Sequence, residues 1–423
     1  MGWVMALMPV ALLVAGFPFF LVLLATVAIA LVFFAGVPST AAHQVMFSSL
    51  DKYALLAVPF FIFAGDLLGR GGVSVRLVRW VQSIIGRMRG SLPFTSLGSA
   101  VVFSAVSGST AATVAAIGGL TYKRLREAGY SEKFSSALLI AAGAIDNLIP
   151  PSIGFILYGI ASDTSIVKLF AAGIFPGLVL AGAYAIYIYR HAVREGDPGG
   201  PPFRMSEFVE ATREGIWAIA APVAVLGGIY AGVFSPTEAA AAACVYAIVV
   251  AMLIYREASP REVFDSAARS MYLTSQVFII LACAGVYSWL LTVTGVTPAV
   301  VGAVSAYDLP PWALLMAINI LLLLVGMVLD TVSAILVLTP LLVPIARAAG
   351  IDPVHFGVVV VMNLSIGTFT PPFGINIFVG QAVFKAPLSS IYPGLVPFIT
   401  AAIGALMVVT YVPQLSLWIL RFI

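Results

Sequence analysis

Eleven long apolar segments, separated by short polar loops, make up most of this chain. They fall near residues 3–35, 53–69, 92–122, 135–161, 167–189, 215–232, 237–255, 271–293, 312–346, 354–384 and 388–420. A membrane-spanning helix needs about 20 mostly apolar residues, and a helix satisfies its backbone hydrogen bonds without help from the lipid. With 61% hydrophobic and only 9% charged residues, the chain is predicted to be an all-α polytopic membrane protein with one transmembrane domain, residues 1–423. The first and last segments each suit two close-set spans or one tilted span.

The polar residues exclude several classes of function. The net charge of +3 does not indicate nucleic-acid binding, because the basic residues lie in loops between apolar segments, where they set topology. Cys244 and Cys283 lie within apolar segments, so we expect neither a disulfide nor a metal site. The sequence has no Ser/His/Asp set, phosphate-binding loop, HExxH or CxxC motif, which predicts that the chain is not an enzyme and has no cofactor. If the chain transports a substrate, it must take the energy from an ion gradient or from another chain, because it has no phosphate-binding loop.

Lysine and arginine gather in four loops, 70–90, 121–133, 190–213 and 256–269, which hold 16 of the 21 basic residues. The positive-inside rule places all four loops in the cytoplasm. Loops 70–90 and 121–133 flank the single apolar segment 92–122. Both loops can lie on one side only if this segment is a re-entrant hairpin.

Each predicted hairpin has a polar tip. The motif SGST at residues 107–110 interrupts the first apolar segment, and GMVLDTVSA at residues 326–334 interrupts segment 312–346. Non-helical backbone at membrane depth is tolerated only where it is buried in protein or lines a wet cavity. The count of crossings makes the first hairpin begin on the inside and the second on the outside.

The two halves of the chain match at an offset of 221 residues. Pro150-Pro151 aligns with Pro371-Pro372, and Thr110 aligns with Thr331. Hairpins that begin on opposite sides predict an inverted-topology repeat, an architecture of many secondary transporters. Repeat one is predicted at about 53–190, with hairpin 92–122 and broken helix 135–161. Repeat two is predicted at about 271–410, with hairpin 312–346 and broken helix 354–384. Scaffold helices are predicted at about 3–35 and 215–255.

Each Pro–Pro pair is expected to break its helix, because proline lacks an N–H and its ring clashes with the carbonyl four residues earlier. The breaks would free the carbonyls of Asp146, Asn147, Gly367 and Thr368. A buried carbonyl without a partner costs several kcal/mol, and a sodium ion, which prefers oxygen ligands, is a suitable partner. The positive N-terminal ends of the half-helices after each break would suit an anionic substrate.

Structural roles compete with these functional ones. The prolines could be plain kinks, and Asp330 could be only the N-cap of the following helix. Asp146 is an intramembrane carboxylate, which indicates function, but it could instead bond to the broken backbone. Asp66 is better read as an interfacial ion pair with Arg70, and Glu238 as a structural cap within the motif SPTE.

Four blocks of sequence resemble a known family. They are FSAVSGSTAATVAAIGGL (103–120), IPPSIGFILYGI (149–160), GVFSPTEAAAAACVYA (232–247) and GMVLDTVSAILVLTPLLVPIARAAGIDPVHFGVVVVMNLSIGTFTPPFGINIFV (326–379). Together they resemble the large membrane subunit of tripartite ATP-independent periplasmic (TRAP) transporters over essentially the whole chain.

This resemblance implies a partnership and a mechanism. The large subunit would work in the inner membrane of a bacterium, within the lipid bilayer, with a small TRAP membrane subunit and a periplasmic substrate-binding protein. It would import a small organic anion, such as a C4-dicarboxylate, a sialic acid or a keto acid, by sodium symport and an elevator motion. In that motion the hairpins and broken helices move as one body against a scaffold, and the basic loops 70–90 and 190–213 brace it near the membrane surface.

The tips and breaks supply the candidate site residues. The candidate sodium ligands are Ser107, Gly108, Ser109, Thr110, Asp146, Asn147, Asp330, Thr331, Gly367, Thr368 and Thr370. The candidate substrate contacts are Ser109, Pro151, Ser152, Asn363, Pro372, Gly374 and Asn376.

Two other functions compete with this one. A channel or proton-translocating subunit would need a chain of intramembrane Lys, Glu or His, and these types are nearly absent from the centres of the apolar segments. A stand-alone ion-coupled carboxylate carrier of the same architecture is the closer rival, and it would transport without a binding protein.

Overall fold

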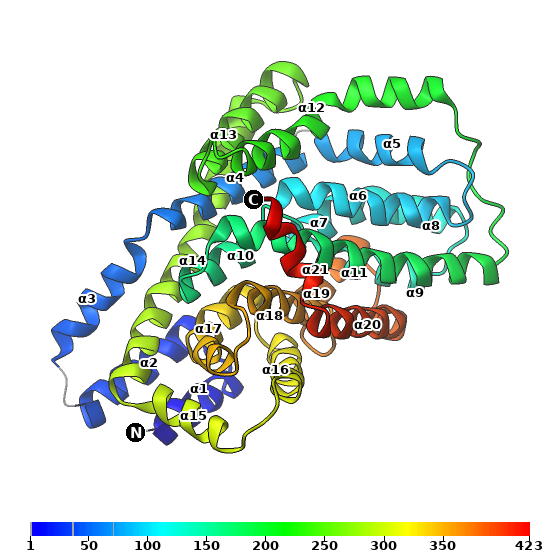
Figure 1. Ribbon diagram of the computed structural model, residues 1–423. Coiled ribbons are helices and arrows are strands. Elements are labelled where there is room, and N and C mark those ends of the chain that lie inside the picture. The colour runs from blue at the N-terminus through cyan, green and yellow to red at the C-terminus, as the bar shows by residue number, and fades with distance from the viewer. Residues whose placement is uncertain (1, 36–37, 71) are drawn as a thin grey trace.

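The computed structural model describes residues 2–35, 38–70 and 72–423, and every regular element within these ranges is helical (Figure 1). Residues 1, 36–37 and 71, which fall in the predicted domain 1–423 and the predicted loop 70–90, lie outside the described residues. The helices up to the first break are α1 (Gly2–Val14), α2 (Phe19–Ala30), α3 (Ser39–Leu50), α4 (Ala57–Arg70), α5 (Val73–Ile85), α6 (Ser91–Ser107), α7 (Thr110–Thr113), α8 (Gly119–Glu127) and α9 (Glu132–Gly143). Those up to the second polar interruption are α10 (Ile153–Ser162), α11 (Ile166–Arg194), α12 (Met205–Tyr230), α13 (Pro236–Ile248), α14 (Pro260–Val293), α15 (Val296–Ala306) and α16 (Pro311–Gly326). The last are α17 (Thr331–Ala348), α18 (Pro353–Gly367), α19 (Ile375–Phe384), α20 (Leu388–Tyr411) and α21 (Gln414–Leu417).

Short helical turns of other types join some of these elements. The π-helical turns are Leu31–Ala35, Val114–Gly118 and Val249–Ile254, and the 3-10 turns are Tyr53–Leu56, Ala144–Asn147 and Trp418–Phe422. Six continuous helices within the described residues are long and apolar enough to cross a membrane: Tyr53–Arg70, Ile166–Arg194, Pro236–Ile254, Pro260–Val293, Thr331–Ala348 and Leu388–Tyr411.

Several helices differ from the boundaries that the apolar segments predict. Segment 3–35 holds two helices, α1 and α2, and not one continuous helix. Helix α5 lies in the predicted loop 70–90, and helices α3 and α15 lie between the predicted apolar segments. Helix α5 is amphipathic: its buried face holds Val73, Leu77, Val78 and Val81, while basic residues interrupt the apolar run on the other face. Such helices are too polar to be recognised as spans from the sequence.

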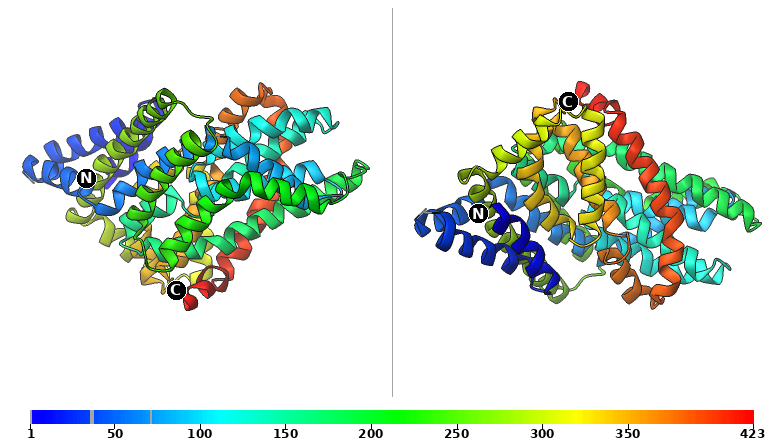
Figure 2. Two further views of the ribbon diagram at one scale, coloured as in Figure 1. Left: turned by 90° about the horizontal axis from the view of Figure 1, so that it is seen from above. Right: turned by 90° about the horizontal axis from the view of Figure 1, so that it is seen from below.

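An outer group of helices surrounds one side of the molecule. Helix α14 packs against α2, α3, α4 and α17, and α4 also packs against α13. Helices α1–α3 lie beside α14 at one side of the molecule in all three views (Figures 1 and 2). Helix α12 packs along α5, where Arg79 forms ion pairs with Glu210 and Glu214.

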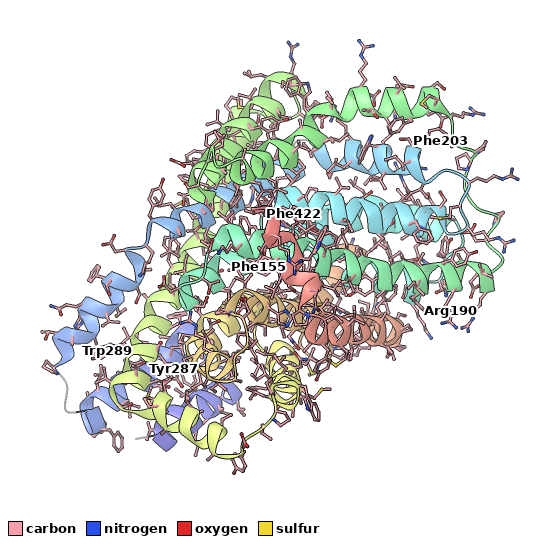
Figure 3. The ribbon with its side chains drawn as sticks, in the orientation of Figure 1. Phe155, Arg190, Phe203, Tyr287, Trp289 and Phe422 are labelled. Carbon is pink, nitrogen blue, oxygen red and sulfur yellow. The ribbon has the colours of Figure 1, made fainter. Side chains whose placement is uncertain are left out.

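The two broken segments form the core. Every residue from 134 to 159 and from 354 to 370 is buried, and Phe155 lies deep in the interior, where Figure 3 labels it. The first segment is α9, the 3-10 turn Ala144–Asn147, the Pro–Pro pair and α10; the second is α18, the Pro–Pro pair and α19. Both Pro–Pro peptide bonds are cis. The prolines predicted to break these helices do so.

Three of the four basic loops contact one another at one end of the molecule. The Asp197 carboxylate accepts hydrogen bonds from the Tyr130 hydroxyl and, at 3.1 Å, from the Gly90 N–H. Gly90 precedes α6 and Tyr130 follows α8, so the chain returns close to the point where segment 92–122 begins. The fourth basic loop joins this surface through an ion pair of 2.7 Å between Glu257 and Arg76.

Candidate functional site

A cavity of about 150 Å³ lies where both polar interruptions meet both Pro–Pro breaks. It is lined by Gly108, Ser109, Thr110, Ala111, Asn147, Ile153, Gly154, Asp330, Thr331, Val332, Thr368 and Ile375. Seven of these belong to the predicted site: Gly108, Ser109, Thr110, Asn147, Asp330, Thr331 and Thr368. The fold therefore brings together residues that lie more than 200 positions apart in the sequence.

Hydrogen bonds join each polar interruption to the break of the opposite half. The Thr110 hydroxyl donates to Asn376 Oδ1 at 2.9 Å, and the Asn147 amide donates to Thr331 Oγ1 at 3.4 Å. The Asn376 amide also donates to Thr368 Oγ1 at 3.1 Å. The two halves are thus cross-braced at the cavity, and the buried polar groups of the braces satisfy one another.

Glycines allow the interruptions to approach the breaks closely. A Cβ atom added at Gly108, whose φ is +67°, would lie 3.0 Å from the Pro151 carbonyl oxygen. A Cβ atom added at Gly367 would lie 2.5 Å from backbone atoms of Gly326, at the end of α16. Only glycine fits at these contacts, because a backbone cannot yield as a flexible side chain can.

Three helices of ten or more residues begin at the cavity. Ile153 and Gly154 open α10, Thr331 and Val332 open α17, and Ile375 opens α19. Helix N-termini carry partial positive charge and unpaired N–H groups, so they favour anions. The described lining side chains include one carboxylate, Asp330, and no lysine or arginine. Asp330 accepts a hydrogen bond of 3.1 Å from the Ser333 N–H, which confirms its predicted capping role.

Most of the carbonyls at the breaks have partners within the chain. Asn147 O accepts the Ser152 hydroxyl at 2.6 Å, Gly367 O accepts the Thr370 N–H at 3.1 Å, and Thr368 O accepts the Asn376 N–H at 2.9 Å. The prolines therefore do not leave these three oxygens free, contrary to the expectation from the sequence. Each carbonyl oxygen still has a second lone pair available for a cation.

Asp146 is a buried carboxylate behind the first interruption. It has no exposed surface, and the Thr113 hydroxyl donates to its Oδ1 at 2.5 Å. Its Oδ2 has no hydrogen-bond partner among the described residues. Ser104 and Ser107 lie near the carboxylate, but their hydroxyls donate to Ala100 O at 2.7 Å and Ser109 O at 3.3 Å. An unpaired oxygen on a buried carboxylate is costly, which suits a bound cation.

The other predicted residues lie around the cavity or apart from it. Ser107, Ser152, Gly367, Gly374 and Asn376 lie next to lining residues in sequence, and the Pro151 carbonyl oxygen lies close to Gly108. Thr370 instead donates to Ile366 O at 2.7 Å, and Pro372 is exposed at the second break. Asn363 does not line the cavity: it donates to Asn319 Oδ1 at 2.7 Å, in a separate buried cluster with Thr410. The prediction missed the apolar lining residues Ile153, Val332 and Ile375, whose only sequence signal is their position in the first helical turn after an interruption.

Two residues have the structural roles that the sequence favoured. Asp66 forms ion pairs with Arg70 at 3.1 Å and with Arg269 at 2.9 Å. Glu238 forms a capping box with Ser235 at the start of α13. These side chains stabilise helix ends and contacts between helices away from the cavity.

Three comparisons identify relatives of this chain. The family model described as the DctM component of the tripartite ATP-independent periplasmic transporter matches residues 4–415. The chain is 39% identical to the ectoine/5-hydroxyectoine TRAP transporter large permease protein UehC of Ruegeria pomeroyi, over 97% of this chain and 96% of that protein. It is 37% identical to the C4-dicarboxylate TRAP transporter large permease protein DctM of Pseudomonas aeruginosa, over 88% of this chain and 87% of that one.

The fold also has a solved counterpart. The YdaH transporter of Alcanivorax borkumensis superposes with a TM-score of 0.68 at 14% identity, and the match covers 89% of this chain and 88% of that one. At this identity the likeness concerns the fold alone. The match of the family model and of full-length relatives goes further: the chain belongs to the family of the DctM component of TRAP transporters, as a multi-pass membrane permease and not an enzyme.

Proposed function

We propose that this permease couples sodium entry to the import of a small organic molecule that carries an oxyanion group. The cavity between the two interruptions and the two breaks is the observation that carries the proposal. Three helix N-termini open there toward an anion, while hydroxyl, amide and carboxylate oxygens at the same place suit sodium. One compact site thus has ligands for both partners of a symport.

The candidate residues divide by chemistry. Asp146, Ser107 and Asn147 would hold one sodium ion behind the first interruption, where Asp146 Oδ2 is unpaired. Ser109 is a candidate ligand of this ion as well as a candidate substrate contact. Thr368, Thr370 and the neighbouring carbonyls would hold another behind the second. The substrate would lie against Ser109, Pro151, Ser152, Gly374 and Asn376, with its anionic group at the N-termini of α10 and α19.

We propose that the chain is an inverted repeat with two re-entrant hairpins, as the charge pattern predicts. Contacts among the basic loops support a common cytoplasmic face. Matching details support the repeat: α10 and α19 each have 10 residues, and each ends at a residue in the left-handed conformation, Asp163 and Lys385. The repeats span about 53–190 and 271–410, and α1, α2, α12 and α13 belong to the scaffold.

An elevator motion is the mechanism that we propose for this architecture. The hairpins and broken helices are cross-braced at the cavity, which supports their movement as one body. Helix α5 and the start of α12 would brace this body, because Arg79 ties them together through Glu210 at 3.2 Å and through Glu214.

The family arrangement implies two further chains in the inner membrane and periplasm of a bacterium: a small membrane subunit and a periplasmic binding protein. The names of the relatives mention ectoine and C4-dicarboxylates. Both are small molecules that carry carboxylate groups, although ectoine is a zwitterion. We therefore propose a carboxylate-bearing substrate, delivered by the binding protein.

The deciding experiment is uptake into proteoliposomes that contain this chain and its small subunit. Organic acids and zwitterions would be offered with or without the binding protein, in sodium or potassium. Uptake that needs both sodium and the binding protein is the expected result. Uptake that does not need the binding protein would favour a stand-alone carrier, and uptake that is indifferent to sodium would contradict the coupling.

Variants locate the sodium ligands within the same assay. Ser109→Ala and Thr368→Val are expected to raise the sodium concentration needed for half-maximal uptake more than the substrate concentration. Thr292→Val, on the exposed end of α14, is the matched control for loss of a hydroxyl. Unchanged sodium dependence in both site variants would show that the assignment of the ligands is wrong.

A further inference from the structure

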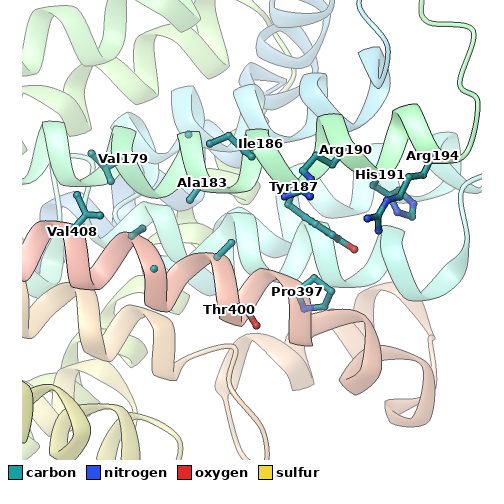
Figure 4. Close-up of a pocket in the computed structure, with 14 residues that line it drawn as sticks. Val179, Ala183, Ile186, Tyr187, Arg190, His191, Arg194, Pro397, Thr400 and Val408 are labelled. Atoms are coloured by element: carbon teal, nitrogen blue, oxygen red, sulfur yellow. The ribbon is translucent and has the colours of Figure 1, made fainter.

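A second and larger cavity, between α11 and α20, shares no lining residue with the candidate site. It has a volume of about 770 Å³ and opens to the surface (Figure 4). Val179, Ala183 and Val408 line one part of it, and Tyr187, Arg190 and Arg194 line the other. Because one part is apolar and the other is basic, the cavity has the character of a site for an amphiphile.

The basic part of the cavity lacks acidic partners. Arg190 and Arg194 lie one helical turn apart in the last turns of α11, and Figure 4 shows both beside Tyr187. Neither arginine forms an ion pair with a carboxylate of the described residues, and no carboxylate lines the cavity. The nearby Glu195 and Asp197 line a neighbouring cleft with Tyr130, which shares His191 with this cavity. Two unpaired guanidinium groups can bind a phosphate group strongly.

The apolar part is hollow because glycines line it. A Cβ atom added at Gly182 or Gly404 would meet no other heavy atom within 4 Å. The side chains of the chain itself therefore leave this space open. In a bilayer, a flexible acyl chain can fill such a groove at no cost in polar desolvation.

The length of the groove matches one leaflet. From Val179 to Arg190 the helix rises about 17 Å at about 1.5 Å per residue, and half of a hydrocarbon core is about 15 Å. An acyl chain that runs along Gly182 would therefore place its headgroup at the level of the two arginines. Arg190 and Arg194 lie in the basic loop predicted to be cytoplasmic, where anionic lipids bind to basic pockets between helices.

We propose that the groove between α11 and α20 binds one anionic phospholipid, with its phosphate at Arg190 and Arg194 and an acyl chain along Gly182 and Gly404. The charge of the unpaired arginines and the length of the groove, which matches one leaflet, favour a lipid over a partner helix. The proposal requires neither the sodium sites nor the substrate site. Because α11 follows the first broken helix and α20 follows the second, the lipid would link the two halves.

Native mass spectrometry of the delipidated full chain tests the proposal. Phosphatidylglycerol and phosphatidylcholine would be titrated separately, with stepwise appearance of the one-lipid species as the readout. The protein is expected to prefer phosphatidylglycerol, and Arg190→Gln with Arg194→Gln should weaken its binding by about 30-fold, at roughly a factor of five per arginine. Arg124→Gln with Arg213→Gln, which removes the same charge from exposed helix positions, is the matched control and should change little.

A second pair of variants tests the acyl-chain groove. Gly182→Leu with Gly404→Leu should place side chains in the open space, since a Cβ at either position meets no other heavy atom within 4 Å, and should abolish the one-lipid species for both lipids. If the variant with Arg190→Gln and Arg194→Gln binds phosphatidylglycerol as tightly as the control with Arg124→Gln and Arg213→Gln, the proposal is overturned. The same measurement would be made on the chain purified with its small subunit. Loss of that subunit, but not of lipid, from the leucine variant would also overturn the proposal and assign the groove to a partner helix.

Discussion

The two Pro–Pro breaks share a sequence pattern but differ in their surroundings. At the first, burial is continuous through both prolines to Gly159, and Ser152 bridges the break by bonding to Asn147 O and the Phe155 N–H. At the second, burial ends at Thr370, and Phe373 is 60% exposed. No side chain caps α19; Asn376, within its first turn, bridges the second break instead.

The difference arises from the helices that follow the breaks. In α11, Gly173 and Gly177 lie so close to Leu148 and Ile149 that an added Cβ would clash with them. The matching motif of α20 places Gly394 against the backbone of Lys133, at the start of α9. The glycine of the same Pro-Gly-Leu motif therefore packs on the first break but not on the second, which α20 reaches through the Tyr392 hydroxyl, a donor to Pro372 O at 3.0 Å. Positions that match at the 221-residue offset are therefore not equivalent in packing, and substitutions at matched positions can measure this difference.

The largest expected effect is at Gly367, which aligns with Asp146 at the 221-residue offset. A Cβ in Gly367→Ala would lie 2.5 Å from backbone atoms of Gly326, and neither backbone can yield without moving a helix. We expect a loss of more than about 3 kcal/mol of stability, together with loss of uptake. Thermal unfolding in detergent measures the first effect, and proteoliposome uptake the second.

Gly154→Ala in the first broken segment is the matched control for this substitution. Its Cβ would lie 3.4 Å or more from any neighbour, and these neighbours are side-chain atoms. We expect a change below about 1 kcal/mol. Equal melting temperatures for the two variants would contradict the close backbone contact between α16 and α18.

The sequence predicted the breaks and polar interruptions well because their signals are local. Pro150-Pro151 and Pro371-Pro372 act on the backbone within four residues, and the polar motifs stand out in apolar surroundings. The same local reasoning found Asp330 as an N-cap. It also found the cavity residues that lie at the interruptions themselves.

Contacts between distant segments could not be read from the sequence. Asn363 lies eight residues before the second Pro–Pro pair, yet its amide bonds to Asn319 on α16, because the rotation of α18 directs it away from the cavity. The bond between Thr110 and Asn376 joins the first interruption to the second break and has no local signal. Helix α5 was missed because its arginines interrupt the apolar run.

The next largest effect is expected at Asp146, which occupies the position that Gly367 holds in the other half. Asp146→Asn keeps an oxygen for the Thr113 hydroxyl but removes the charge beside the unpaired Oδ2. The sodium concentration for half-maximal uptake should rise at least about tenfold, since a hydrogen bond or ligand to a charged group is worth about 1.5–3 kcal/mol. Asp163→Asn, at an exposed turn, is the control. Equal sodium dependence in both variants would remove Asp146 from the sodium site.

The aligned pair Thr110 and Thr331 sharpens the comparison at the cross-braces. Thr110→Val breaks a bond of 2.9 Å and leaves Asn376 Oδ1 without this donor, whereas Thr331→Val breaks a bond of 3.4 Å. We expect losses of about 1–2 kcal/mol for Thr110→Val and less than about 1 kcal/mol for Thr331→Val. Thermal unfolding of both single variants and the double variant would measure them. A larger loss of stability for Thr331→Val than for Thr110→Val would contradict the prediction that the hydrogen bond of Thr110 is the stronger of the two.

The smallest expected effect is at the aligned positions Ser152 and Phe373, and it tests whether the closed break depends on its cap. Ser152→Ala removes the acceptor of the Phe155 N–H and the donor to Asn147 O, so we expect a loss of about 1 kcal/mol. Phe373→Ala removes an exposed ring and should change stability by less than about 0.5 kcal/mol. Thermal unfolding of the two variants measures the difference.

Because Ser152→Ala frees Asn147 O without removing an oxygen from the first sodium site, the sodium dependence of uptake by this variant should stay unchanged. A rise in the sodium requirement would instead show that Ser152 positions that carbonyl for the ion, which would make the closed break part of the coupling site.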